Sequence, residues 1–215
     1  MPEPTLLLRP LTTADEAQAL LAERELAADG FDFLVGRDGR PFDRYVELLA
    51  ATREGRDLPP GYVPATFLVG LVDGDLVGRV SVRHQLNEHL ARVGGHIGYG
   101  VRPGFRRRGY ATALLRGGLA ITAGLGIEQA LETCDDANVA SSAVIERCGG
   151  VLQDVLADGA ARVRRYLVPT SAVYTSAVRT SAVQPSAVPT SDEAARLRAG
   201  TPCRRRTRPP RARPA

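Results

Sequence analysis

Residues 96–115 read HIGYGVRPGFRRRGYATALL, and they combine a strand pattern, a loop and a helix pattern. It starts with a β-type apolar segment, passes through a loop rich in Arg and Gly, and ends in an apolar helix-forming run. A loop of this kind presents unpaired backbone N–H groups at the positive end of the following helix dipole. The sequence therefore predicts a phosphate or pyrophosphate site between a strand and a helix.

The side chains of the loop suit such an anion. Arg106, Arg107 and Arg108 add positive charge, while the Thr112 hydroxyl lies in the first helical turn. Small residues allow an anion to approach the backbone closely. The predicted anion-binding residues are Arg106, Arg107, Arg108, Gly109, Tyr110, Ala111 and Thr112.

Other phosphate-binding and nucleic-acid-binding motifs fit this stretch less well. Gly104 and Gly109 have the glycine spacing of a P-loop, but Tyr110 and Ala111 stand where its Lys-Ser/Thr pair is required. No GxGxxG motif follows a strand, so a dinucleotide-binding Rossmann site is unsupported. An RNA-binding loop would need more aromatic neighbours than Phe105 and Tyr110.

The segments on either side of this stretch alternate between strand and helix patterns. Two hairpins are predicted, one turning at Asp73-Gly74-Asp75 and one at Asp158-Gly159. Strands are predicted near residues 5–9, 65–72, 76–84, 94–101, 127–134, 151–156 and 162–168, and helices near 13–29, 41–53, 108–123 and 138–148. This order predicts an α/β (α+β) fold, in which helices flank a mixed, mainly antiparallel sheet with one strand–helix–strand crossover.

The chain changes character near residue 168. The segments TSAVY, TSAVR and TSAVQ repeat every five residues, a period that matches neither a helix nor a strand. From residue 168 onward nine Arg stand against two acidic residues, whereas the preceding residues carry 19 Arg and 22 acidic residues. We therefore predict one domain over residues 1–168 and a low-complexity, basic, disordered tail over residues 169–215.

Composition excludes several classes of protein. No apolar run approaches the roughly 20 residues of a membrane helix, and residues 1–10 lack the pattern of a secretion signal, so a cytoplasmic protein is expected. Three widely spaced cysteines predict neither disulfides nor a thiolate zinc site. His84, Glu88 and His89 miss the H-x-x-E-H metal spacing by one residue, so no metal is expected.

Two motifs resemble those of the GNAT superfamily of N-acetyltransferases. Residues 106–111, RRRGYA, match the Q/R-x-x-G-x-G/A acetyl-CoA signature of that family. Residues 138–152, NVASSAVIERCGGVL, resemble its second signature, which begins with Asn. The resemblance covers roughly residues 5–168, and YVPATF, VRHQLN and CDDANVAS are similar to a branch of acetyltransferases of unknown substrate.

The resemblance implies acetyl-CoA as co-substrate. The pantetheine arm would pair with backbone near Val101, and the pyrophosphate would meet the N–H groups of residues 107–112. Asn138 and Ser141 would contact the pantetheine or adenosine part, although simple capping of a helix is the alternative explanation for both. A backbone N–H near Tyr99 would stabilise the oxyanion that forms during transfer.

The proton-transfer groups are less clearly marked. Many family members carry a Tyr that protonates the departing sulfur, and Ile145 occupies the matching position here. Tyr99 or a water molecule is the candidate replacement. His96 is the candidate general base, and the competing interpretation is a half-buried histidine with a structural hydrogen bond.

Three functions follow as hypotheses. The first is an N-acetyltransferase acting on a primary amine of a small molecule or a peptide, and the net negative domain favours a cationic acceptor weakly. The second is a catalytically idle acyl-CoA-binding or regulatory module, which the residue Ile145 favours. The third is nucleic-acid binding through the basic tail alone. A monomer or a homodimer is expected, with no membrane partner.

Overall fold

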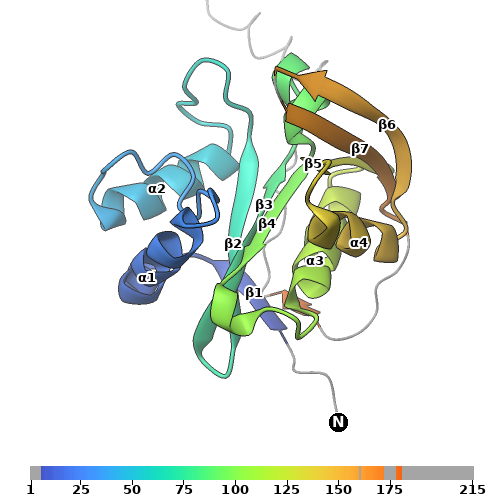
Figure 1. Ribbon diagram of the computed structural model, residues 1–215. Helices are drawn as coiled ribbons and strands as arrows, with labels where there is room; N and C mark the ends of the chain where they lie inside the picture. Colours follow the sequence, from blue (N-terminus) through green and yellow to red (C-terminus); the bar gives the residue numbers. More distant parts are fainter. Residues whose placement is uncertain (1–5, 160, 172–177, 181–215) are drawn as a thin grey trace, which may run out of the picture.

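The structure is a computed structural model that describes residues 6–159, 161–171 and 178–180 (Figure 1). The strands are β1 (Leu6–Pro10), β2 (Ala65–Val72), β3 (Asp75–Arg83), β4 (Ile97–Val101), β5 (Gln129–Asp135), β6 (Val151–Asp158), β7 (Ala161–Pro169) and β8 (Val178–Thr180). The helices are α1 (Glu16–Ala27), α2 (Phe42–Arg53), α3 (Tyr110–Gly124) and α4 (Val139–Arg147), with short helical segments η1 (Thr13–Asp15), η2 (Leu90–Gly94) and η3 (Pro103–Phe105). The predicted order of helices and strands is confirmed, and β8 is an addition to it.

The strands form two sheets. The larger has the order β4-β3-β2-β1-β8, in which β8 is parallel to β1 and the other pairs are antiparallel. The smaller is antiparallel, with the order β5-β7-β6. Helices α1 and α2 cover one face of the larger sheet, and α3 covers the other (Figure 1). The mixed, mainly antiparallel fold class is therefore confirmed, with the sheet divided between β4 and β5.

The division begins where β4 and β5 touch. The His96 N–H donates to the Leu131 carbonyl at 2.7 Å, and no strand pairing continues along β4 from there. Gly95 permits the contact, because a Cβ atom at this position would lie only 2.6 Å from the Leu131 oxygen. Its φ of 61° is also one that glycine adopts without strain. The crossover β4–α3–β5 therefore joins two strands that are hydrogen-bonded to each other at one end and separated by a cleft at the other.

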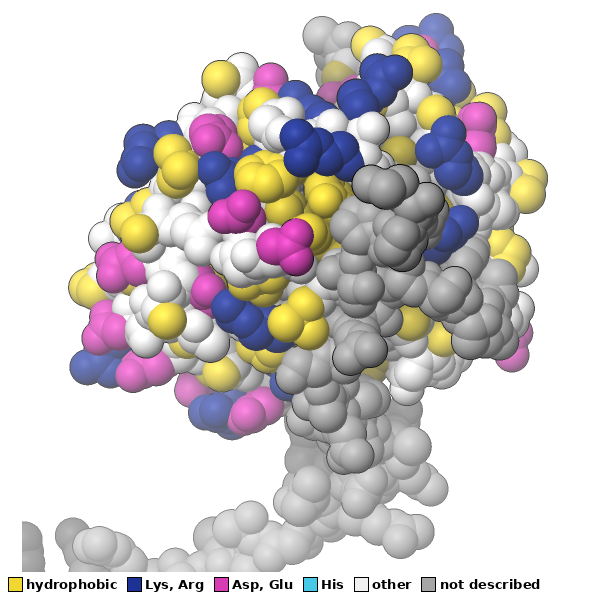
Figure 2. Space-filling model, turned by 90° about the horizontal axis from the view of Figure 1, so that it is seen from below, with side chains coloured by type: hydrophobic (Ala, Val, Ile, Leu, Met, Phe, Trp, Pro, Cys, Tyr) yellow, Lys and Arg dark blue, Asp and Glu magenta, His cyan; other side chains and the backbone are white. Residues whose placement is uncertain are grey.

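Two apolar clusters hold the sheets and helices together. The first lies between α3 and both sheets, and Leu114, Leu115 and Leu119 of α3 are fully buried in it. The second lies between α1, α2 and the larger sheet, around Tyr45 and Phe67. On the face seen in Figure 2, charged side chains of both signs surround apolar ones near the centre. Burial on both faces of β2 and β3 explains their continuous apolar sequences.

The predicted domain boundary falls one residue before the end of β7. Beyond it Thr170 is buried and its hydroxyl donates to the Ile127 carbonyl at 2.6 Å. Residues 178–180 differ from the predicted disorder, because the edge of β1 offers free backbone groups with which β8 pairs. Residues 172–177 and 181–215 of the predicted tail lie outside the described part of the chain.

A buried carboxylate joins the end of β1 to the start of α1. Asp15 accepts two hydrogen bonds from the Arg9 guanidinium at 2.7 Å and two from the Thr12 backbone and hydroxyl at 2.8 Å. Burial alone would raise the pKa of Asp15, but the bonds from Arg9 and Thr12 outweigh it and lower the pKa. Thr12 and Asp15 together form a capping box at this helix start.

We predict that Asp15→Asn lowers the free energy of unfolding by about 2 kcal/mol at pH 7, because a charge-assisted pair is lost. The folded-state pKa is below the unfolded value, so this stability is present above the unfolded pKa and disappears as the pH falls through the folded one. Urea unfolding at pH 7 and near pH 3 should therefore show a smaller difference at the lower pH. Glu47→Gln, in an exposed pair with Arg44, is the control and should change stability by less than about 0.5 kcal/mol.

Candidate functional site

A cavity of about 920 Å³ follows the free edge of β4 to the loop before α3 and the first turns of α4. Most of the predicted site residues line it, namely Tyr99, Val101, Arg106, Arg107, Gly109, Tyr110, Ala111, Thr112, Asn138 and Ser141. Arg108 and His96 do not line it. The Arg108 guanidinium instead lies 5.9 Å from the centre of the Phe105 ring. The fold thus brings residues 99–112 together with residues 138–141 around one cleft.

The backbone of β4 presents hydrogen-bond donors to this cleft. Arg83 N–H donates to the His96 carbonyl at 2.8 Å, and Arg102 N–H donates to the Val77 carbonyl at 2.9 Å, so the even-numbered residues of this strand bond to β3. Alternation along an antiparallel ladder then directs the N–H groups of Tyr99 and Val101 the other way, toward the cleft. Neither N–H has a hydrogen-bond partner within the described part of the chain.

The loop before α3 leaves further donors free. Gly109 precedes the helix with a φ of 82°, and no side chain caps the first turn. The first N–H groups of α3 are therefore available to an anion, as the sequence predicted. Arg106 is partly occupied, because its Nε donates to the Val101 carbonyl at 3.1 Å and its Nη2 pairs with Asp29. Arg107, with a φ of 63°, is exposed.

Asn138 caps α4, because its Oδ1 accepts the Ser141 N–H at 3.0 Å. This is the capping geometry that the sequence analysis held as the alternative to ligand binding. Capping engages Oδ1 alone, and both Asn138 and Ser141 line the cavity. The two explanations are therefore compatible in this structure.

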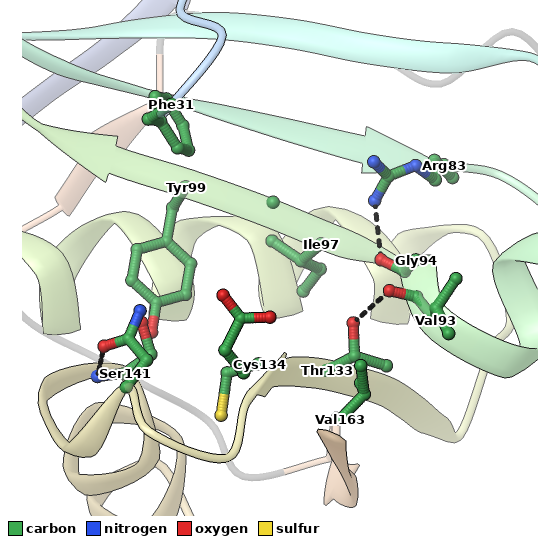
Figure 3. Close-up of a pocket in the computed structure, with 13 residues that line it drawn as sticks. Phe31, Arg83, Val93, Gly94, Ile97, Tyr99, Thr133, Cys134, Ser141 and Val163 are labelled. Atoms are coloured by element: carbon green, nitrogen blue, oxygen red, sulfur yellow. Dashed lines mark hydrogen bonds between the residues drawn. The ribbon is translucent and has the colours of Figure 1, made fainter. Parts of the chain in front are cut away.

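Tyr99 is the buried hydroxyl of the cleft. Its OH lies beside Ser141 (Figure 3) but outside ordinary hydrogen-bond geometry, and no other described group pairs with it. Burial raises the pKa of Tyr99, and the nearby Ser141 hydroxyl lowers it by a smaller amount. The phenol is consequently protonated near neutral pH and has a proton to donate.

Ile145, by contrast, points away from the cleft. Its side chain is 1% exposed and packs in the cluster beneath α3, against Gly150. It does not line the cavity, whereas Ser141 and Val144 of the same helix do. Tyr99 is the tyrosine on the cleft wall at β4, so it can take the place of a proton donor on α4.

His96 is engaged in the joint between the two sheets. It is 9% exposed, and its Nδ1 accepts the Leu131 N–H at 2.9 Å. Burial lowers its pKa, which favours the neutral ring. In a neutral ring whose Nδ1 accepts, the proton is on Nε2, so neither nitrogen has a free lone pair for a substrate proton. The geometry therefore favours the structural interpretation of His96 over that of general base.

We predict that His96→Leu lowers the free energy of unfolding by about 2 kcal/mol, because the buried Leu131 N–H loses its acceptor. Activity per folded molecule should fall by less than about 3-fold, in contrast to the roughly 100-fold or larger effect of removing a general base. His89→Gln, at an exposed position, is the control and should change neither property. A large loss of kcat with unchanged stability would restore His96 as the base.

The sequence analysis missed four residues beside the cleft: Phe31, Arg83, Glu132 and Asp135. Glu132 is 1% exposed, and burial raises the pKa of its carboxyl group well above the ordinary range. Its available signal was a single acidic residue within an apolar strand. Phe31 packs over Gly100, where a Cβ atom would lie 2.5 Å from its ring. No sequence pattern marked that contact.

The described residues contain no group of three His, Cys, Asp or Glu side chains placed to hold a metal ion. His84, one member of the polar cluster seen in the sequence, pairs through Nε2 with the Thr66 hydroxyl at 2.9 Å. Among the described helices, none is long and apolar enough to cross a membrane.

Comparison with protein families places these features in context. A family model described as "Acetyltransferase (GNAT) domain" matches residues 5–151. This is more than half of the chain, and the protein belongs to the GNAT acetyltransferase family. The search of curated proteins gave no match.

Solved structures agree on the fold. The acetyltransferase yncA from Salmonella typhimurium, solved with acetyl-CoA, is 13% identical with a TM-score of 0.55, covering 86% of this chain and 99% of its own. RimL, a ribosomal alpha-N-protein acetyltransferase in complex with coenzyme A, is 17% identical with a TM-score of 0.58, covering 77% and 94%. A chimera of the spermidine N-acetyltransferase SpeG from Vibrio cholerae and hSSAT is 18% identical with a TM-score of 0.53, covering 78% and 96%. The acceptors named for these proteins differ, so the shared feature is acetyl transfer on a common fold.

Proposed function

We propose that the protein is an acetyl-CoA-dependent N-acetyltransferase that moves an acetyl group to a primary amine by direct attack on the thioester. One observation carries this proposal. The free N–H groups of Tyr99 and Val101 face the same cleft as the uncapped start of α3. A cleft with donors at both ends fits an extended molecule with an amide-bearing arm and a pyrophosphate, and this is the chemistry of acetyl-CoA.

Different residues of the cleft would bind different chemical groups of acetyl-CoA. The Val101 N–H would pair with an amide carbonyl of the pantetheine arm, and the N–H groups of residues 107–112 would hold the pyrophosphate, with charge from Arg106 and Arg107. Asn138 and Ser141 line the opposite wall. Arg108, which points to Phe105, contributes only long-range charge in this proposal.

The residues near Tyr99 would perform the transfer. The Tyr99 N–H would stabilise negative charge that develops on the thioester oxygen. The amine nitrogen forms a bond to the carbonyl carbon, the carbon–sulfur bond breaks, and the sulfur ends as a thiol. The Tyr99 hydroxyl, unpaired and protonated, would supply that proton. An amine of pKa ~10 is mostly protonated at pH 7, so its own proton must leave first, through water or a carboxylate.

A catalytically idle acyl-CoA-binding module is the second candidate, because Ile145 is buried and offers no proton donor on α4. The two proposals agree on the binding of CoA and differ in turnover. We expect the cytoplasm as the site of action and a monomer or a homodimer as the assembly. Nucleic-acid binding stays confined to the basic tail in this proposal.

The deciding experiment measures thiol release from acetyl-CoA by the full-length chain against a panel of primary amines, with calorimetric titration of CoA alongside. Turnover with any amine supports the enzyme. CoA binding without turnover by any amine favours the module. Folded protein that binds no CoA would refute both, since the assignment of residues 106–112 would fail.

A further inference from the structure

A second cavity, of about 280 Å³, opens across the free edge of β4 toward its start. It shares Phe31, Tyr99, Asn138 and Ser141 with the larger cleft. The remainder of its wall consists of Arg83, Val93, Gly94, Ile97, Gly98, Thr133, Cys134, Asp135 and Val163 (Figure 3). Its size is near the lower end for small-molecule sites. Tyr99 borders both cavities. A molecule in the second cavity, which we call the acceptor cavity, would therefore lie next to a thioester held in the larger one.

One wall of the acceptor cavity carries a fixed guanidinium. Arg83 is the last residue of β3, and its Nη1 donates to the Gly94 carbonyl at 3.0 Å (Figure 3). The same atom donates to the Gly95 carbonyl at 3.2 Å. The group reaches over Gly98, where a Cβ atom would lie 3.8 Å from Nη1 and 3.9 Å from Nη2. Its Nε and Nη2 donate to no described residue. The two carbonyls therefore hold the fork in place and leave part of it free for a ligand.

The guanidinium of Arg83 has no salt-bridge partner among the described residues. Burial lowers the pKa of Arg83, and Glu132, whose own carboxyl pKa is raised by burial, opposes part of that shift from beyond salt-bridge distance. Arg79, fully buried, adds a second guanidinium beside Gly98 through its hydrogen bond to the Gly98 carbonyl at 3.2 Å. A half-buried cation outside any salt bridge is costly, and an anionic group of a ligand would offset that cost.

The same cavity also contains an acid. Asp135, the last residue of β5, is exposed and lines it together with Thr133 and Cys134. Tyr99 lies next to Gly98 in sequence, and neighbouring strand residues are ~3.3 Å apart along the chain. The guanidinium over Gly98 and the proposed reaction point at Tyr99 therefore belong to neighbouring positions of one cavity wall.

We propose that the acceptor is a small α-amino acid, with its carboxylate bound by Arg83 and its amino group facing Tyr99 and Asp135. This inference rests on the proposed acetyltransferase function and names its substrate class. The amine proton leaves through Asp135 to solvent, the nitrogen bonds to the acetyl carbon, and the sulfur departs as a thiol after protonation. The product keeps its carboxylate. The cationic acceptor that the net charge of the domain favours fits the part of this cavity beside Gly98 poorly, because the fixed group there is the guanidinium of Arg83.

The test compares matched acceptors with the full-length chain and acetyl-CoA. Each L-amino acid is paired with the amine that lacks only its carboxylate, such as leucine with 3-methylbutylamine and phenylalanine with phenethylamine, and spermidine and phosphoethanolamine are added. We expect kcat/KM for the amino acid of at least one pair to exceed that of its partner by about 10-fold or more, the range of a charge-assisted bond.

Three variants test whether the preference for a carboxylate depends on Arg83 and Gly98. Arg83→Gln should remove the preference for the carboxylate by raising KM for the amino acid, while kcat/KM for the matched amine that lacks the carboxylate does not fall. Gly98→Ala adds a methyl group that makes only ordinary van der Waals contacts. It should weaken the binding of the amino acid, because the methyl group occupies space beside the guanidinium. Arg92→Gln, at an exposed position on η2, is the charge-matched control and should leave the preference unchanged. Calorimetric CoA binding checks that each variant is folded.

The outcomes separate this inference from the proposed function. A preference for spermidine, for phosphoethanolamine or for the amines that lack the carboxylate would overturn the inference and leave the acetyltransferase intact. If CoA binds without turnover, the inference is tested by titrating the amino acids directly into the CoA complex. It is overturned if no amino acid binds, or if Arg83→Gln binds the amino acids as tightly as the wild type does. Absence of CoA binding would remove the function and the inference together.

Discussion

Gly109→Val should weaken CoA binding by about 100-fold or more. Gly109 has a φ of 82°, a conformation that a β-branched residue adopts only with strain, and the left-handed region costs ordinary residues about 1–2 kcal/mol. Relief of that strain would turn the first N–H groups of α3 away from the anion they are proposed to hold. The added side chain would also project from the wall of the cleft, which Gly109 lines.

Gly104→Val is the matched control for this change. Gly104 lies in the same loop, has open space around it as Gly109 has, and lacks a positive φ. It does not line the cleft. Calorimetric titration of CoA into the full-length variants should therefore show a loss for Gly109→Val alone. Equal affinities for the two variants would refute the anion site at the start of α3.

Tyr99→Phe should lower kcat by about 100-fold, at the lower end of the range for general acid–base catalysis. The substitution removes only the hydroxyl, whose hydrogen-bonding capacity is unused by the described residues. KM for acetyl-CoA should be unchanged, because the Tyr99 N–H and the cleft wall are retained. Since burial raises the pKa of Tyr99 above its ordinary value, the wild type should lose no activity through its ionisation between pH 7 and about 10.

Tyr166→Phe provides the comparison. Its hydroxyl is hydrogen-bonded to Glu146 at 3.2 Å, the ring is fully buried, and it lines neither cavity. This variant should lose some stability, about 1 kcal/mol for one hydrogen bond, and keep its kcat. Steady-state rates from pH 6 to 10 for both variants separate the two roles. If Tyr99→Phe is as active as the wild type, the sulfur is protonated by water.

The role of His96, the predicted general base, could not be decided from the sequence. The position of His96 in a glycine-rich strand left two interpretations open, a general base and a histidine with a structural hydrogen bond, and the sequence slightly favoured the structural one. The choice depends on whether its Nδ1 is free, and that is decided by Leu131, 35 residues away along the chain. Arg83 was not a candidate at all, because an arginine at the end of a strand ordinarily faces water. Here it is half-buried, and its Nη1 donates to the carbonyls of Gly94 and Gly95, which precede β4.

The sequence by itself determined the local features of this protein. The glycines and arginines of residues 104–109 fix the loop and its open helix start, Asn138 caps the next helix, and hairpin turns set the strand order; each depends on the backbone preferences of a few adjacent residues. Only the tertiary structure decided the division between β4 and β5, the burial of Ile145, the unpaired hydroxyl of Tyr99 and the guanidinium over Gly98. These depend on contacts between segments distant in the chain, where packing and burial, rather than local propensity, set which polar groups find a partner and which are left for a ligand.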